Sequence, residues 1–421
     1  MRKESAFLWA ILLTALIINP VAVTIRYNVT DLGTLPGYNS SRAWSINNNG
    51  QVIGWAESVD PSHYIMKAVL FDATGTGNNI DLGTLGGENS YAHSINITGQ
   101  IVGAADFNEF PSKRYATIFD ANGEGNNMKL AIDSWALSIN DNGWIVGGKK
   151  NSFGYQQAIL FDPNDTNKNI ELGSLDGFNH SNAYSINNCG QIVGYALNDL
   201  IIGDSRATLF DASGQGNNID LGTLGGEYSA AISINDYGRI VGRADTAAGS
   251  CHAVLFDPNG TGNNVDLGTL EGCNFLVAAS INNRDQIVGQ ASEDALSGFC
   301  AVMFDPTGNG DNLDLNDLID PTLCYSLSTA ICINDNGWIV CWGSNPDGYS
   351  RAFLLSPARP GDSEPNRDVD LRDFAVFAAA WRSTPADEKW NPFCDISEPE
   401  DDLIDERDLA VFVDNYLMQS P

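Results

Sequence analysis

The residues near the C-terminus have the oxygen-bearing side chains and the spacing of a calcium-binding loop. Calcium loops place ligands at positions 1, 3, 5, 9 and 12, and position 7 binds through its backbone carbonyl. Here these residues are Asp362, Glu364, Asn366, Asp370 and Asp373, with Asp368 at position 7. Carboxylates packed this closely repel one another unless a cation neutralises them. The loop therefore predicts bound Ca²⁺, with a solvated acidic linker as the alternative.

A second copy of this unit follows the first, because "DVDLRDFAVF" aligns with "LIDERDLAVF". The second loop is longer, and its expected ligands are Asp395, Ser397, Asp401, Asp405 and Asp408. Apolar residues after each loop recur at helical spacing, which predicts two short helices whose apolar faces pair. The first face contains Phe374, Phe377 and Trp381, and the second Leu409, Phe412, Val413 and Tyr416.

This duplicated loop–helix segment resembles a dockerin domain over about residues 359–419, within a predicted C-terminal domain of residues 358–421. The resemblance implies a Ca²⁺-binding module that docks onto a cohesin-like or other surface scaffold protein, often in polysaccharide-degrading systems. Arg367 stands where the dockerin loop usually has Gly, which puts the calcium affinity in doubt. Leu371-Arg372 and Glu406-Arg407 replace hydroxyl-bearing recognition residues, which leaves the partner open.

The rest of the chain repeats one pattern of four short apolar segments. The motif "SIN–x-x-G–QIVG" predicts a tight hairpin, and "LFD-x-x-G-x-G-NN-IDLG" a looser one. The first hairpin occurs seven times, from Ser45 to Cys332, at intervals of about 47 residues. The last copy lacks its fourth segment, whereas Arg26–Gly33 is a fourth segment without a repeat. We therefore predict an all-β fold over residues 26–357, a seven-bladed β-propeller in which the N-terminal strand closes the ring by pairing with Arg351–Leu355.

These motifs resemble the HAF-repeat family of exported bacterial proteins. The third segments "CHAVLFD" and "RATLFD", the connector "DLGTLGG" and the hairpin "SINxxGQIVG" carry the resemblance. It implies an exported repeat protein and no defined reaction. Residues that recur in every repeat are explained by the fold, so we expect a binding site where the repeats differ.

Aromatic residues in the variable connections between second and third segments, and just after the second, are candidates for stacking on sugar rings. These are Trp55, Tyr64, Phe107, Tyr155, Tyr195, Trp342 and Tyr349. Ordinary packing of aromatic side chains at the sheet edges is the alternative. In "CINDNGWIVC" a two-residue turn at Asn336-Gly337 would place Cys332 opposite Cys341, which predicts a disulfide, with two buried thiols as the alternative.

The composition limits the classes of partner. A net charge of −31 excludes a nucleic-acid binder, which needs clustered basic residues. The basic start and the apolar run Ala6–Ile18 predict a signal peptide over residues 1–23, with a retained anchor as the alternative. No later segment is long and apolar enough to span a membrane. We expect a secreted, cell-surface or periplasmic bacterial protein.

Signatures of catalysis are sparse. None of the four histidines lies in a zinc motif, and no nucleophile elbow or P-loop occurs, so we name no catalytic residue. We predict a binding or assembly protein whose propeller presents a face to a glycan or a protein, and whose tail binds Ca²⁺ and anchors it. The alternative is a polysaccharide-acting hydrolase or lyase that uses paired carboxylates.

Overall fold

The computed structural model describes residues 27–58, 64–108, 113–198, 204–294, 298–358 and 371–417, apart from 388, 390–393, 395 and 398–402. The described residues fall into two compact units, Val29–Ser356 and a unit that includes the helices after Pro357. The predicted signal peptide lies outside the described residues. No described helix is long and apolar enough to cross a bilayer.

The larger unit contains seven repeats, and each begins with a strand that leads into the Ser-Ile-Asn motif. Repeat 1 contains β2 (Ser40–Ile46), β3 (Val52–Glu57), β4 (Met66–Phe71) and β5 (Ile80–Asp81). Repeat 2 contains β6 (Gly86–Ile95), β7 (Ile101–Phe107), β8 (Lys113–Phe119) and β9 (Met128–Ile132). Repeat 3 contains β10 (Ser134–Ile139), β11 (Ile145–Lys150), β12 (Gln156–Phe161) and β13 (Ile170–Gly173).

Repeats 4 to 7 follow the same order. Repeat 4 contains β14 (His180–Ile186), β15 (Ile192–Leu197), β16 (Ser205–Phe210) and β17 (Ile219–Asp220). Repeat 5 contains β18 (Gly225–Ile234), β19 (Ile240–Thr246), β20 (Cys251–Phe256) and β21 (Val265–Asp266). Repeat 6 contains β22 (Phe275–Ile281), β23 (Ile287–Ser292), β24 (Cys300–Phe304) and β25 (Leu313–Asp314). Repeat 7 contains β26 (Ser326–Ile333), β27 (Ile339–Ser344) and β28 (Ser350–Pro357), beside β1 (Tyr27–Asp31).

The predicted closed seven-bladed propeller is wrong in its strand pairing, although the all-β prediction is confirmed. The strands form five sheets, four of four strands and one of twelve, and none of them closes on itself. Single parallel bridges, Ser205 with Tyr228 and Cys251 with Phe275, merge repeats 4, 5 and 6 into the twelve-stranded sheet.

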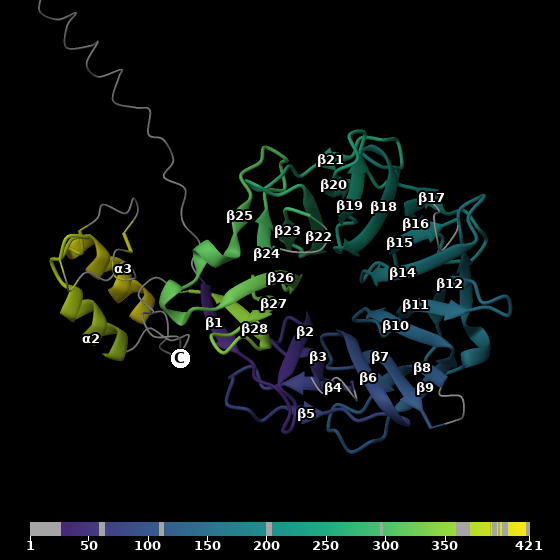
Figure 1. Ribbon diagram of the computed structural model, residues 1–421, viewed down its shortest axis with the longest axis horizontal. Helices are drawn as coiled ribbons and strands as arrows, with labels where there is room; N and C mark the ends of the chain where they lie inside the picture. The colour runs from purple at the N-terminus through teal and green to yellow at the C-terminus, as the bar shows by residue number, and fades with distance from the viewer. Residues whose placement is uncertain are drawn as a thin grey trace, which may run out of the picture. The chain divides into compact units, whose positions relative to one another are not determined.

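The expected pairing of the N-terminal strand is confirmed. β1 lies at the edge of the last sheet beside β28, and the Leu32 amide donates to the Ala352 carbonyl at 3.0 Å. The first strands of the repeats, β2 to β26, converge on a common centre, with β1 and β28 beside β2 (Figure 1). Apolar clusters lie between neighbouring repeats, and one contains Val52 and Val69 of repeat 1 with Val340 and Leu354 of repeat 7. The repeats therefore share their cores.

Two repeated asparagines connect each repeat to its neighbour. In the Ser-Ile-Asn motif, Asn187 accepts from the Cys189 and Gln191 amides and donates to the Asn235 carbonyl of repeat 5 at 2.9 Å. In the Asn-Asn motif, Asn218 accepts from the Asp211 amide and donates to the Leu172 carbonyl of β13, in the preceding repeat, at 2.9 Å. These side chains satisfy backbone groups that no strand pairs, so the repeated residues of the sequence are structural.

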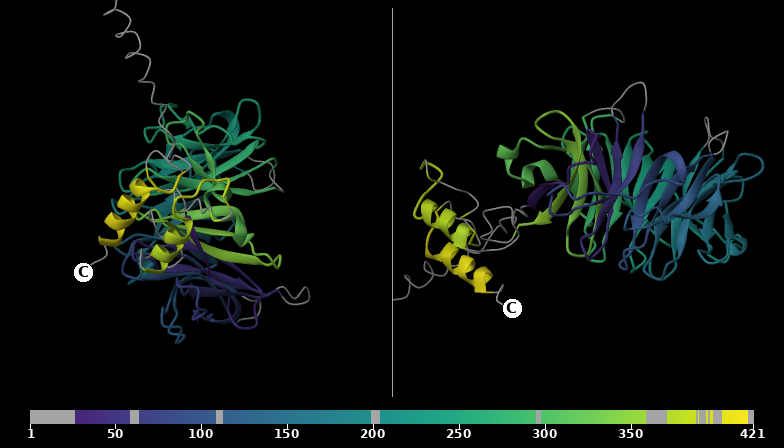
Figure 2. Two further views of the ribbon diagram at one scale, coloured as in Figure 1. Left: turned by 90° about the vertical axis from the view of Figure 1, so that its left-hand side faces the viewer. Right: turned by 90° about the horizontal axis from the view of Figure 1, so that it is seen from below.

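The smaller unit contains two helices, α2 (Leu371–Ala380) and α3 (Glu406–Leu417). Both are visible in Figure 2 as the two helices of the C-terminal part. Phe377 and Phe412 are buried, with ring centroids 5.3 Å apart, and Phe374 lies 5.8 Å from Phe412. The expected pairing of the two apolar faces is confirmed.

Candidate functional site

Two cavities lie in succession along the common centre of the repeats. The narrower, about 180 Å³, is lined by the Ile-Asn pair that ends each first strand and by the residue that follows it. The wider, about 710 Å³, begins at the preceding residue, the Ser of the motif or Cys332, and extends along the first strands. The two cavities are therefore built by adjoining parts of one repeated hairpin.

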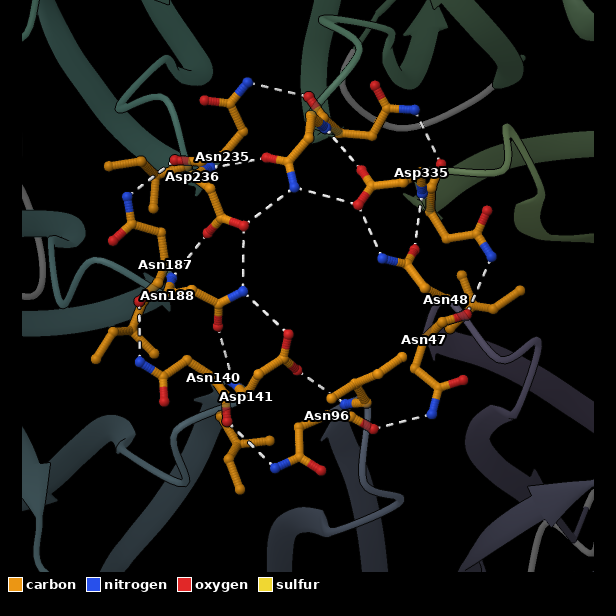
Figure 3. A pocket seen from close by; sticks show the side chains of 18 of the residues that line it. Asn47, Asn48, Asn96, Asn140, Asp141, Asn187, Asn188, Asn235, Asp236 and Asp335 are labelled. Atoms are coloured by element: carbon orange, nitrogen blue, oxygen red, sulfur yellow. Dashed lines mark hydrogen bonds between the residues drawn. The ribbon is translucent and has the colours of Figure 1, made fainter.

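The narrow cavity is occupied by a ring of side chains that satisfy one another (Figure 3). The residue after each motif asparagine alternates between amide and carboxylate, and the order is Asn48, Ile97, Asp141, Asn188, Asp236, Asn283 and Asp335. Asn188 donates to Asp141 at 3.0 Å and to Asp236 at 3.1 Å. Asn48 donates to Asp335 at 2.8 Å, which joins the last repeat to the first.

In a ring of seven positions, amide and carboxylate side chains cannot alternate all the way round. Ile97 is the one position that interrupts the alternation. Its side chain has no polar atom, and its backbone amide donates to Asp141 at 2.8 Å. The three carboxylates of the ring are thus matched by amide and backbone donors. We assign this end of the centre to structure.

The wide cavity is lined by a β-bulge from every repeat. The ladder between first and second strands shifts at the same place each time, between Ala43 and Ser45 in repeat 1 and between Ala183 and Ser185 in repeat 4. The unpaired residue at this bulge position differs between repeats and lines the cavity, as bulged residues next to functional sites often do. These residues are Trp44, His93, Leu137, Tyr184, Ile232, Ala279 and Ile331.

The glycine of the "IVG" motif allows a close backbone approach at the bulge in repeats 1 to 6, whereas repeat 7 has Cys341 at this position and keeps the bulge. A Cβ at Gly54 would lie 2.0 Å from the Arg42 carbonyl, and one at Gly194 would lie 1.9 Å from the Asn182 carbonyl. The next residue, which we call the post-glycine position, varies as the bulge position does. Its occupants are Trp55, Ala104, Gly148, Tyr195, Arg243, Gln290 and, after Cys341, Trp342.

Large side chains fill the side of the centre formed by repeats 7, 1 and 2. The Trp44 and Trp55 rings lie 4.9 Å apart, and Tyr91 stacks on His93 at 6.2 Å. The Arg42 guanidinium lies 4.5 Å above the Trp342 ring. The open volume is therefore bounded mainly by repeats 4, 5 and 6, where Tyr195, Tyr228, Arg243, Phe275 and Gln290 line it.

Two polar groups of the cavity, His93 and Tyr184, are held in uncharged forms. Burial lowers the pKa of His93 to about 4, and its Nδ1 lies 2.8 Å from the Ala136 carbonyl. Because a carbonyl only accepts, Nδ1 carries the proton and Nε2 is an acceptor. Burial also raises the pKa of Tyr184, whose ring lies 5.2 Å from that of Tyr195. These phenols remain protonated donors at neutral pH.

Carboxylates are absent from the described residues that line the wide cavity, and Arg243 is their one cationic side chain. An adjoining cavity of about 220 Å³ shares Ser205, Tyr228, Arg243 and Phe275 and adds Asp245 and Cys251. Burial raises the pKa of Asp245, and Arg243 opposes that shift. The pair of carboxylates that a typical glycoside hydrolase needs is therefore not found among these lining residues.

The structure separates the aromatic residues predicted from the sequence. Tyr195 lines the wide cavity. Trp55 and Trp342 lie in the aromatic packing of repeats 7, 1 and 2, and Phe107 packs against Tyr115 at 5.8 Å. Tyr64, Tyr155 and Tyr349 are exposed and line none of the cavities above. The sequence reasoning missed Tyr184, Tyr228, Arg243 and Phe275, although variation at the bulge and post-glycine positions would have indicated Tyr184 and Arg243.

The predicted disulfide between Cys332 and Cys341 is absent, and both are free thiols. The bulge of repeat 7 shifts the register, so Cys332 pairs with Val340 and Cys341 with Ala330. Two-residue hairpin geometry alone does not include this extra residue. The alternative of two unlinked thiols is the one observed.

Most of the predicted calcium ligands lie outside the described residues. These are Asp362, Glu364, Asn366, Asp368, Asp370, Asp395 and Asp401, and the side chain of Asp373 in α2 is also outside the description. Asp408 is fully buried and accepts from the Ile396, Ser397 and Asp405 amides at 2.7–2.8 Å. The Ser397 hydroxyl is buried and has no hydrogen-bond partner in the described part of the chain. Among the described residues, no three acidic, His or Cys side chains gather into a metal site.

Comparison with known proteins gives a match to a family described as "Protein of unknown function (DUF3466)" over residues 108–219. No curated protein matches the chain. Similar solved structures include a protein of unknown function from Dyadobacter fermentans, with 9% identity, a TM-score of 0.35, and 80% of this chain and 100% of that chain covered.

Two further solved structures are enzymes. A sialidase from Trypanosoma rangeli, in complex with sialic acid, has 9% identity and a TM-score of 0.35, with 86% of this chain and 62% of the sialidase covered. The catalytic domain of a GH62 α-L-arabinofuranosidase from Coprinopsis cinerea has 9% identity and a TM-score of 0.32, with 80% and 98% covered. Likenesses at this distance do not identify the function of the chain.

Proposed function

We propose that the protein is a binding protein that holds a saccharide in the wide cavity. The observation that carries this proposal is the lining, which combines aromatic rings with hydroxyl and amide groups and lacks a carboxylate pair. Tyr195, Tyr228 and Phe275 offer faces for the C–H surface of a sugar, and Ser205 and Gln290 offer hydrogen bonds. A volume of about 710 Å³ is typical of a small-molecule site.

The same lining argues against the alternative of a polysaccharide-degrading enzyme. Hydrolysis of a glycosidic bond ordinarily uses two carboxyl groups on either side of the bond. Asp245, in the adjoining cavity, is the one carboxylate among the described residues of either cavity. Binding without turnover is the simpler function for this arrangement.

The test is a binding screen against a panel of oligosaccharides, followed by calorimetry on wild type and two variants. Tyr195→Ala removes a ring from the cavity and should weaken binding at least tenfold, since stacking on an aromatic ring contributes about 1.5 kcal/mol. Tyr349→Ala is the matched control, because Tyr349 is exposed and lies outside the cavity lining. Loss of binding in Tyr349→Ala alone would place the site on the outer loops, and release of shorter sugars would restore the enzyme alternative.

We also propose that the C-terminal unit binds Ca²⁺ and anchors the protein to a surface scaffold partner outside the cell. Asp408 has one acceptor position left beyond its three amide donors, and Ser397 brings a buried hydroxyl without a partner. Both fit a hard cation that takes oxygen ligands. Ca²⁺ would supply the positive charge that allows the acidic loops to pack.

Calcium titration of the full chain, followed by calorimetric unfolding, tests this second proposal. Ca²⁺ should raise the melting temperature of the transition that belongs to the C-terminal unit, and Asp408→Asn should remove that rise. Asp387→Asn is the matched control, since Asp387 is an exposed acid bonded to Thr384. An unchanged melting temperature from zero to millimolar Ca²⁺ would rule the site out.

A further inference from the structure

We propose that the saccharide bound in the wide cavity is acidic, and that its carboxylate pairs with Arg243. This inference rests on the proposed function and names the class of ligand. It depends on the position of Arg243, on the absence of an ion pair within 4 Å of its guanidinium, and on the groups that surround it.

Arg243 occupies the post-glycine position, which differs between repeats and lines the wide cavity in repeats 4, 5 and 6. It is the post-glycine residue of β19, opposite Ala230 of β18 in the ladder, and both residues line the wide cavity. The same position has Tyr195 in repeat 4 and Gln290 in repeat 6, which line the cavity on either side. Arg243 is itself exposed in that space, so a ligand can reach its guanidinium.

Arg243 and Arg284 are the two arginines among the described residues of the repeats without a carboxylate within 4 Å, and of the two only Arg243 lines the wide cavity. A carboxylate lies within 4 Å of each of five others, which are Arg42, Arg114, Arg206, Arg239 and Arg351. Among the described residues, no ion pair or hydrogen bond engages the Arg243 side chain. Asp245 lies two residues along the same strand and attracts Arg243, but no ion pair within 4 Å joins the two side chains. A guanidinium without a contact ion pair favours a ligand that brings a carboxylate, which it can bind through two parallel hydrogen bonds.

The surrounding groups suit a sugar ring beside that carboxylate. Tyr228 and Phe275 line both the wide cavity and the small cavity beside Arg243. Gln290 accepts from the Thr329 hydroxyl at 2.9 Å, which fixes its amide and leaves both N–H groups as donors. Aromatic faces, amide donors and one cation together match a uronic acid, which has an apolar ring face, hydroxyls and one carboxylate.

The strongly negative net charge does not oppose this assignment. The carboxylates of the chain lie outside the described lining of the wide cavity. At 0.1 M salt, charges more than about 10 Å apart are largely screened, whereas a contact ion pair in a partly desolvated cavity is not. Recognition is therefore decided by the local charge of Arg243 and not by the total of −31.

The experiment compares an acid with its neutral ester. Tri-galacturonate and tri-mannuronate, each with its fully methyl-esterified form, are titrated into full-length wild type, Arg243→Gln and Arg284→Gln. Gln is accommodated at this position, as Gln290 shows in repeat 6, so R243Q should fold normally. Arg284 is an exposed arginine on the hairpin turn of repeat 6, so R284Q makes the same charge change away from the cavity.

Wild type should bind at least one acid tenfold or more tightly than its ester. R243Q should lose that preference while its affinity for the ester stays within about twofold of wild type, and R284Q should behave as wild type. Arg243→Lys should fall between, because it keeps the charge and loses the fork of parallel donors. Equal binding of acid and ester by wild type overturns the inference and leaves the proposed function standing. If no saccharide of any kind binds, both are overturned.

Discussion

The two ends of the common centre are built by the same hairpin and behave differently. At one end the motif asparagines and the alternating ring of Asn and Asp bond to one another and to backbone, and almost no varied residue takes part. At the other end, the bulge position, three residues before each motif asparagine, changes from Trp to Ala between repeats. A residue recurs in every repeat where its side chain makes all its hydrogen bonds to the protein itself. It varies between repeats where its side chain faces the open cavity.

This difference separates residues whose substitution should lower the stability of the fold from residues whose substitution should change the affinity for a ligand. The Asn187 side chain makes four hydrogen bonds, two as an acceptor and two as a donor, so no other side chain replaces it. Tyr184, three residues earlier, contacts the Tyr195 ring, and no other repeat has tyrosine at either of these two positions. The predictions below test whether the two classes are as separate as the contacts imply.

The largest effect should follow from removing a motif asparagine. Asn187→Ala leaves the Cys189 and Gln191 amides without an acceptor and removes the link to the Asn235 carbonyl of repeat 5, and each unsatisfied buried group costs about 1–3 kcal/mol. We expect a loss of about 3 kcal/mol in the free energy of unfolding, measured by urea denaturation. Exposed Asn217, which bonds only within its own loop, is the control, and Asn217→Ala should cost under about 0.5 kcal/mol.

A smaller loss of stability should follow from Asn218→Ala, and it should exceed the loss from Asn217→Ala in the same Asn-Asn pair. Asn218→Ala breaks bonds to the Asp211 amide and to the Leu172 and Ser174 carbonyls of the preceding repeat. We expect it to cost about 2 kcal/mol, again by urea denaturation. An equal cost for Asn217→Ala and Asn218→Ala would show that the link between repeats adds nothing beyond the local loop.

Acid should destabilise the protein through His93. Its pKa is about 4 in the folded chain and about 6.5 when unfolded, so below pH 6.5 the unfolded chain binds a proton that the folded chain refuses. Stability should therefore fall between pH 6.5 and 4 by about 1–2 kcal/mol, reduced from the full shift because the ring is only partly buried. In His93→Gln this component of the pH dependence should vanish, and an unchanged profile would contradict the assignment.

The smallest effect should come from disturbing the alternation of amide and carboxylate side chains in the ring of the narrow cavity. Asp236→Asn places three amides in a row, and the Asn188 and Asn283 side chains lose a shared acceptor. We expect about 1 kcal/mol of destabilisation by thermal unfolding. Ile97→Thr changes the one position outside the alternation and should cost less than Asp236→Asn. The reverse order would mean that the ring does not act as a matched set.

Much of the fold could be predicted from recurrence, because local turn chemistry specifies it. The Ser-Ile-Asn hairpins and the strand that pairs with β28 follow from counting segments. The short junction between β9 and β10 departs from the other connectors, and Asp133 there adopts a positive φ of 52°. The predicted strand partition failed because single parallel bridges join three repeats, and such contacts depend on how neighbouring connectors pack.

The site was predicted less well, for one physical reason. The bulge adds one residue to every first strand, and this turns the bulge side chain into the cavity. It explains both the missed Tyr184 and the mistaken Cys332–Cys341 pairing. The alternation of inward and outward side chains along a strand does not reveal an extra residue. The glycine that recurs in the "IVG" motif was the available signal, because a Cβ there would clash with the backbone of the first strand.

The most direct test of the claim that the ligand binds in the wide cavity is to fill that cavity with a side chain that another repeat already has at the same position. Ala279 is the bulge residue of repeat 6, and Trp44 occupies the same position in repeat 1. Calorimetric titration of Ala279→Trp with the saccharide that wild type binds should show at least a tenfold loss of affinity, with the unfolding free energy within about 1 kcal/mol of wild type. Wild-type affinity in this variant would contradict the account, because the ligand would then bind elsewhere.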